Sequence, residues 1–147
     1  MTGAQRQPEL DGFDALVGEW TTEATHPAFP SLAIHGESRF DWLEGGHFLI
    51  QRSSNEHPDF PDALAVFGAF DSELLMHYYD SRGVYRVYET SMRDGVWRFS
   101  RDVPGFAQRL TGTVEDDGQT IVCLSQLCED GSTWADDLAI TYRRRHA

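Results

Sequence analysis

Turn-forming residues recur at short, even intervals along this chain, and they limit its fold more than any other feature. The turn signals are Gly45-Gly46, Pro58 to Pro61, Arg82-Gly83, Asp94-Gly95, Pro104-Gly105, Asp117-Gly118 and Asp130-Gly131. Several of them are Asp-Gly or Gly-Gly pairs, which suit hairpin turns because these residues accept a positive φ. The intervening runs of about 7–12 residues are rich in β-branched and aromatic residues, and this spacing is typical of an all-β sandwich or barrel.

Ten strands are predicted from these runs. They are Glu19–His26, Leu32–Leu43, His47–Ser54, Leu64–Asp71, Leu74–Asp80, Val84–Met92, Val96–Arg101, Phe106–Glu115, Thr120–Leu127 and Trp134–Arg143. The connections are too short for parallel crossovers, so we expect an antiparallel meander. Closing that sheet removes its free edges. The sequence therefore predicts one closed antiparallel β-barrel of about ten strands spanning residues 1–147, with residues 1–9 flexible and a short helix near 8–17, for which Asp11 or Asp14 could serve as cap.

Composition and charge narrow the class of protein further. Hydrophobic residues make up 40% of the 147 residues, and 24 acidic against 12 basic residues give a net charge of −12. The electrostatic field of this negative charge repels a phosphate backbone, so we do not expect nucleic acid to be a partner. No apolar run approaches the roughly 18 residues of a membrane helix, and the N-terminal residues lack the apolar stretch of a signal peptide. We expect no membrane association and a cytoplasmic location.

The two cysteines, Cys123 and Cys128, lie in one predicted strand. Five extended residues span about 16 Å, well beyond the roughly 7 Å that a disulfide allows between Cα atoms. They are predicted to be free thiols, and two cysteines alone make no zinc motif. The sequence also lacks a Gly-x-Ser-x-Gly elbow, a phosphate-binding loop and His-Glu-x-x-His, so no metal site and no particular catalytic class is predicted.

Which face of each strand lines the barrel interior is only partly readable. In the last strand Trp134, Asp136, Leu138, Ile140 and Tyr142 alternate with more polar residues. In the run from Leu74 to Tyr79 both phases carry large side chains, so alternation does not choose the inner face.

Four segments, together with the opening Leu16-Val17-Gly18-Glu19-Trp20, carry a resemblance to a known family. They are RFDWLEGGHFLIQRS (39–53), YYDSRGVYRVYE (78–89), FAQRLTGTVEDDGQTI (106–121) and DGSTWADDLAITYRR (130–144). The pattern resembles small calycin-like barrels that are distantly similar to nitrobindin and to lipocalins. The resemblance implies that Arg143 or Arg144 stacks on Trp20 by a cation–π contact. Nitrobindin-like proteins hold haem through a histidine near the C-terminal end of the barrel, where this chain has none, so haem is disfavoured and no cofactor is expected.

Ten residues are candidates for contact with a ligand in the lumen. They are Trp42, Gln51, Arg52, His77, Tyr79, Arg86, Tyr88, Trp97, Phe99 and Arg109. Aromatic walls with a few placed polar groups are typical of apolar pockets, although ordinary core packing explains an aromatic residue at least as well. His77 is compatible with ligand binding or acid–base chemistry, and equally with a plain wall position. The arginines either face inward toward an anion or a carboxylate, such as that of Glu89 or Asp136, or lie along the outer wall.

The expected function is binding of a small, mostly apolar molecule in the lumen of the barrel. Two alternatives stay open: a cyclase- or isomerase-type enzyme that uses the same lumen, and a haem-binding nitrobindin-like protein. A single scaffold hosts many functions, so the fold does not choose among them. The sequence also leaves open whether the protein forms a homodimer.

Overall fold

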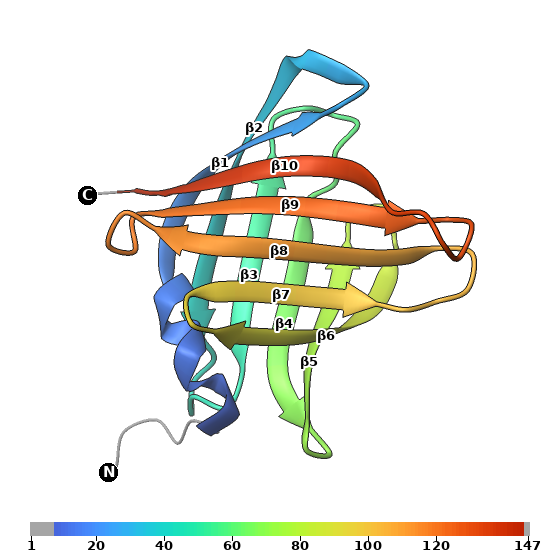
Figure 1. Cartoon of the computed structure of the whole chain (residues 1–147). Helices are drawn as coiled ribbons and strands as arrows, with labels where there is room; N and C mark the ends of the chain where they lie inside the picture. Colours follow the sequence, from blue (N-terminus) through green and yellow to red (C-terminus); the bar gives the residue numbers. More distant parts are fainter. Residues whose placement is uncertain (1–7, 146–147) are drawn as a thin grey trace.

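Ten antiparallel strands pair in chain order, and the last strand returns to pair with the first, so that the sheet closes on itself (Figure 1). The computed structural model describes residues 8–145. The elements are η1 (Pro8–Leu16), β1 (Gly18–His26), β2 (Phe29–Trp42), β3 (Leu49–Asn55), β4 (Ala63–Phe70), β5 (Glu73–Asp80), β6 (Tyr85–Arg93), β7 (Val96–Arg101), β8 (Ala107–Glu115), β9 (Thr120–Cys128) and β10 (Ala135–Arg144). Strands β3–β5 cross β7–β10 at a steep angle in Figure 1.

The predicted all-β barrel is confirmed, and every strand begins and ends within three residues of its predicted position. The largest difference is at β2, which starts at Phe29 instead of Leu32 because the β1–β2 hairpin continues past the barrel rim with His26 opposite Phe29. The N-terminal helix is of the 3-10 type and spans Pro8–Leu16, close to the predicted 8–17. Of the segment 1–9 that was predicted to be flexible, residues 1–7 lie outside the described residues. Within 8–145, no helix is long and apolar enough to cross a membrane.

The helix η1 closes one end of the barrel. Its apolar residues Leu10, Phe13 and Leu16 are each 0% exposed, and the helix contacts β4 and β6. In Figure 1 it lies at the lower left, opposite the β1–β2 hairpin that projects at the top. The barrel therefore has a closed end at η1 and an open end at the hairpin.

The first and last strands are joined at the closed end by Arg144. Its guanidinium lies 4.1 Å from the centre of the Trp20 ring and donates to the carbonyl oxygens of Ala15, Val17 and Gly118 at 3.0, 2.6 and 3.2 Å. Gly18 has a φ of 130°, and a side chain there would meet the guanidinium. The expected stacking on Trp20 is thus confirmed for Arg144. The glycine of the Gly-x-Trp sequence is explained by the same contact, because a side chain at Gly18 would occupy the place of the Arg144 guanidinium.

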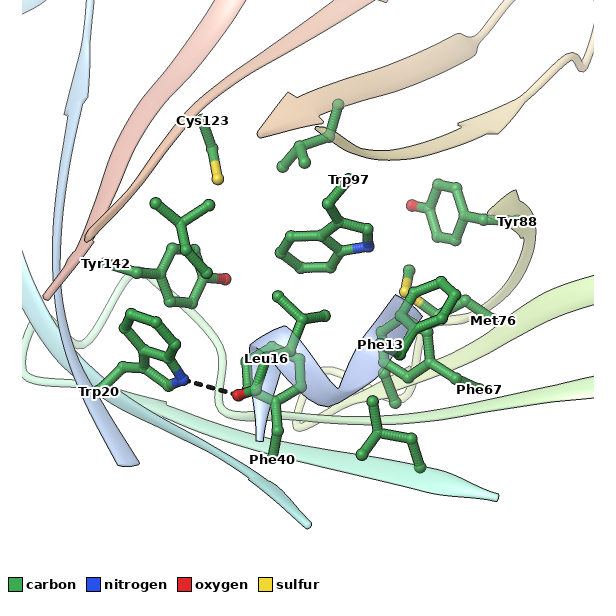
Figure 2. Close-up of a cluster of buried hydrophobic side chains, with 14 of the residues drawn as sticks. Phe13, Leu16, Trp20, Phe40, Phe67, Met76, Tyr88, Trp97, Cys123 and Tyr142 are labelled. Atoms are coloured by element: carbon green, nitrogen blue, oxygen red, sulfur yellow. Dashed lines mark hydrogen bonds between the residues drawn. The ribbon is translucent and has the colours of Figure 1, made fainter. Parts of the chain in front are cut away.

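Inward-facing aromatic side chains fill the barrel next to this closed end. Figure 2 shows Trp20, Phe40 and Tyr142 near Leu16, with Phe67 farther along beside Phe13. The Trp20 indole nitrogen donates to the Leu16 carbonyl oxygen at 2.8 Å. Residue 112, which is paired with Trp97 across the β7–β8 ladder, is glycine. A Cβ at that position would clash with Cys123 Sγ at 2.7 Å, while the Trp97 ring, at 3.6 Å, would stay in ordinary contact.

A register shift in β10 breaks the alternation that the sequence suggested for the last strand. The pairing with β9 is irregular between Asp136 and Ala139. Because a bulge adds one residue to one strand, side chains before it change face. Asp136 lies on the outer surface, where Gln126 contacts it at 2.8 Å, and Asp137 turns toward the open end, where it contacts His26 at 3.3 Å.

Candidate functional site

Two adjoining hollows at the open half of the barrel form the candidate site, and Tyr78 lines both. The inner cavity has a volume of about 150 Å³ inside the lumen. The mouth, of about 690 Å³, lies between the β1–β2 hairpin, the β3–β4 loop and the ends of β6, β8 and β10. The two hollows share Tyr78 in their linings, and together they are called the chamber below.

The floor of the inner cavity carries a hydrogen-bonded polar group. The Gln51 amide donates to Ser38 Oγ at 3.0 Å, to Ser53 Oγ at 3.3 Å and to the Tyr142 hydroxyl at 3.4 Å. Burial raises the pKa of Tyr142 above its ordinary value, so the phenol stays protonated and able to donate. Around this group the wall is apolar, with Met76, Phe99, Leu110 and Ile140.

Trp97 lines the cavity and also carries a buried polar atom. It is 1% exposed, and its Nε1 has no hydrogen-bond partner among the described residues. In Figure 2 the indole nitrogen lies on the side of Tyr88, away from Tyr142. A buried N–H without an acceptor is uncommon in folded proteins and calls for an explanation.

The wall between the cavity and the mouth is held in place by Tyr78 and Tyr88. Tyr78 donates to Asp80 Oδ2 at 2.8 Å, and Arg82 holds the same carboxylate at 2.6 Å. Tyr88 meets Tyr78 edge-on at 6.2 Å and donates to Gln108 Oε1 at 3.1 Å. The hydrogen bonds from Arg82 hold the pKa of Asp80 well below its usual range, and burial, reinforced by Asp80, raises the pKa of Tyr78.

The mouth combines apolar walls with a small number of charged side chains. Its apolar lining is Phe29, Leu32, Ile34, Phe60, Pro61, Phe106 and Leu138. Phe29 is 64% exposed at the tip of the hairpin. Large apolar side chains exposed around a hollow are a feature of ligand-binding surfaces.

Six of the ten sequence-predicted residues face the interior. They are Trp42, Gln51, Arg86, Tyr88, Trp97 and Phe99. Five of these lie in or next to the chamber. The exception is Trp42, which is at the closed end, where its indole donates to Asp14 of η1 at 3.0 Å.

The other four predicted residues lie on the outer face, away from the lumen. Arg52 is half exposed and pairs with Asp41 at 3.6 Å. Arg109 stacks on Trp134 at 3.9 Å and donates to Gln126 at 2.8 Å. The physical reason is strand phase, since each of these residues stands next to an inward-facing neighbour.

His77 and Tyr79 belong to an aromatic row on the outside of β4–β6. The His77 ring packs edge-on against Phe70 at 4.7 Å, and its Nδ1 lies 3.1 Å from the Tyr85 hydroxyl. Tyr79 stacks on Tyr85 at 5.1 Å and is 42% exposed. The structure therefore does not bring the histidine favoured by the sequence to the chamber.

Sequence reasoning missed the residues that shape the chamber most. Tyr78 and Met76 were in the phase of β5 that alternation left undecided, and Tyr142 and Ile140 were read only as an apolar face. The one available signal for Tyr142 was that it stands two residues from Arg144 and so shares its face. The mouth residues of the hairpin gave no signal, because the hairpin was not expected to extend past Leu32.

Metal-binding chemistry finds little support at this site. Among residues 8–145, no three His, Cys, Asp or Glu side chains come together in a way that could hold a metal ion. Both cysteines are free thiols, as predicted. Cys123 is buried in the barrel wall, and this burial raises its pKa to about 12, so it is a poor thiolate ligand or nucleophile.

Comparison with known proteins supports the fold and goes no further. No family model matches the chain, and no curated protein matches it. Among solved structures it is similar to the crystal structure of Rv2717c from M. tuberculosis, with a TM-score of 0.68, 15% identity, and coverage of 97% of this chain and 100% of that one. The chain thus has the same closed barrel fold as Rv2717c.

Proposed function

We propose that the protein binds a small, mostly apolar molecule in the lumen of its barrel. The observation that carries this proposal is the chamber itself: the inner cavity and the open mouth meet at Tyr78. A lumen filled by its own side chains would leave no room for a ligand. Here the closed end is packed solid, and the open half is not.

The sizes of the two hollows indicate how a ligand would be divided between them. A dry cavity of about 150 Å³ holds a molecule the size of benzene, and the inner cavity has this volume. Drug-sized ligands occupy pockets of roughly 300–1,000 Å³, a range that includes the mouth. One ring-sized apolar group would enter the inner cavity, and the remainder of the ligand would lie in the mouth.

Polar groups in the inner cavity favour a ligand with a hydrogen-bond acceptor. Tyr142 lines this cavity, and its phenol is protonated and buried. An acceptor on the ligand would receive the hydrogen bond that this phenol can donate, which raises affinity because an unpaired buried donor costs about 1–3 kcal/mol.

Catalysis and haem binding remain alternatives to simple carriage. The inward-facing side chains of β10 around the chamber are Leu138, Ile140 and Tyr142, so the strand offers no imidazole to a haem iron at the place where nitrobindin-like proteins have one. Two other imidazoles, His26 and His57, line the mouth beside carboxylates. Purified protein titrated with haemin tests this alternative directly, because histidine ligation produces a sharp shifted Soret band.

Fluorescence titration with N-phenylnaphthylamine, a neutral apolar dye, tests the proposed function. We expect saturable enhancement with one dye per chain. The Ala65→Phe substitution places a ring in the inner cavity, since Ala65 lines it and is 3% exposed, and should weaken dye binding at least tenfold. The matched control is Ala139→Phe on the exposed face of β10, which should bind the dye as the wild type does.

The unfolding midpoint of each variant shows whether its barrel is intact. If Ala65→Phe unfolds, Ala63→Leu, a smaller change in the same cavity wall, replaces it. Equal dye binding by folded cavity and control variants would contradict the proposal. Native mass spectrometry of the purified protein then identifies any bound molecule, and chemical change of that molecule during incubation would favour an enzyme over a carrier.

A further inference from the structure

The carboxylates at the mouth of the chamber each lie beside an imidazole or an arginine, whereas one mouth arginine, Arg86, has no carboxylate beside it among the described residues. Of the mouth-lining side chains, His26 lies 3.3 Å from Asp137, His57 lies 3.9 Å from Asp59, and Arg82 lies 2.6 Å from Asp80. Arg86 has no carboxylate within 4.0 Å among the described residues. In a chain with a net charge of −12, a mouth arginine without a counter-charge is unexpected.

Arg86 stands where the mouth meets the inner cavity. It is directly opposite Tyr78 in the β5–β6 ladder, and Tyr78 lines both hollows. The guanidinium carbon lies 5.3 Å from the centre of the Phe106 ring. This cation–π contact holds the guanidinium beside the ring, and its N–H groups that do not interact with Tyr88 are available for a forked contact with an oxyanion.

A second cation, Arg101, lies near Arg86. Arg86 itself interacts with the Tyr88 hydroxyl through a hydrogen bond and its charge, and Arg101 adds a further positive charge there. The mouth carboxylates of Asp59 and Asp137 each lie beside an imidazole, and that of Asp80 is engaged by Arg82 and Tyr78. A half-buried cation that has a neutral phenol but no carboxylate beside it is stabilised most by an anion from outside the chain.

We propose that the ligand of this chamber is an apolar molecule with one oxyanionic group, a carboxylate or sulfonate, and that Arg86 binds this group at the mouth. This inference rests on the proposed function and deepens it. The apolar end of the ligand occupies the inner cavity beyond Tyr78, and the anionic end stays at the rim, where water reaches it. The orientation follows from the geometry, since the charge is at the mouth and the walls of the inner cavity are mainly apolar.

A matched pair of dyes tests the inference. Anilinonaphthalene sulfonate and N-phenylnaphthylamine share their ring skeleton and differ in the sulfonate group. Wild-type protein should bind the sulfonate more tightly. Arg86→Gln should weaken sulfonate binding by roughly ten- to a hundredfold, the range for hydrogen bonds to a charged group, and change neutral dye binding less than twofold. Arg86→Lys should fall between the two, because it keeps the charge and loses the fork.

The control is Arg98→Gln, which makes the same charge change at an exposed residue of β7 and should leave both dyes unaffected. If Arg86→Gln weakens both dyes equally, or neither, the anion site is refuted and the proposed function stands. If wild-type protein binds the neutral dye and not the sulfonate, the inference is again refuted. Failure of both dyes to bind the folded wild type refutes the proposed function itself.

Discussion

The two ends of the barrel each hold an inward-facing arginine stacked on an aromatic ring, and they differ in everything else. At the closed end Arg144 lies over Trp20 and is bound by three backbone carbonyl oxygens. At the open end Arg86 lies over Phe106 with no carboxylate beside it. The first arginine has its partners within the chain and stabilises the fold. For the second we propose a partner from outside the chain, the anionic group of a ligand.

The largest expected effect comes from the closed end. Trp20 is fully buried, and Trp20→Ala should lower the free energy of unfolding by about 3–5 kcal/mol, because the ring leaves a cavity that the barrel cannot refill. Phe29→Ala at the open end is the control and should cost less than about 0.5 kcal/mol, since Phe29 is 64% exposed. Urea unfolding followed by circular dichroism measures both values. If both variants lost a similar amount of unfolding free energy, the closed end would not be more tightly packed than the open end.

A smaller effect separates the two arginines directly. Arg144→Met keeps the length of the side chain but leaves the carbonyl groups of Ala15, Val17 and Gly118 without their donor, which should cost about 1–3 kcal/mol. Arg86→Met removes no hydrogen bond to the backbone of the described residues and should change stability by less than about 0.5 kcal/mol. The same unfolding measurement applies. A large loss in Arg86→Met would assign that arginine a structural role.

The smallest expected effect concerns the ion pair of Asp80 and Arg82 at the open end. There, as at the closed end, an arginine has its partner within the chain. The hydrogen bonds from Arg82 lower the pKa of Asp80 in the folded state. A lowered pKa adds stability that is complete above the unfolded value of about 3.9 and is lost as the pH falls below it. Asp80→Asn should therefore be less stable than wild type by about 1 kcal/mol at pH 7, allowing for the half-exposed Arg82.

The pH dependence provides the decisive comparison for Asp80. The difference in unfolding free energy between wild type and Asp80→Asn should be constant from pH 7 to about pH 5 and should narrow toward pH 3. A difference that does not change with pH would mean that the carboxylate acts by its shape alone and not by its charge.

Sequence reasoning predicted the barrel well because turns and strands are local signals. Asp94-Gly95 and Asp117-Gly118 mark hairpins whatever the rest of the chain does, and a closed meander follows from short connections. The face of each strand is a different kind of information. His77 and Tyr78 are neighbours with similar ring-bearing side chains, and only the packing of the whole sheet places one outside and the other in the chamber.

Two further features of the site were beyond a reading of the sequence. The bulge in β10 turns Asp137 into the mouth, and no residue type in that strand signals it. The lack of a counter-charge at Arg86 is a property of all its neighbours together. Arg52, Arg86 and Arg109 read alike along the chain, and only one of them reaches the chamber.

The pairing of β1 with β10 also has a consequence for how the protein is made. Trp20 and Arg144 meet across almost the whole chain, so a nascent polypeptide on the ribosome cannot complete its ring until the final strand has been released from the exit tunnel. Until then β1 and β9 each present an unpaired edge that another copy could join. The edges of β1 and β9 are thus open to aggregation until β10 has emerged and Arg144 has reached Trp20.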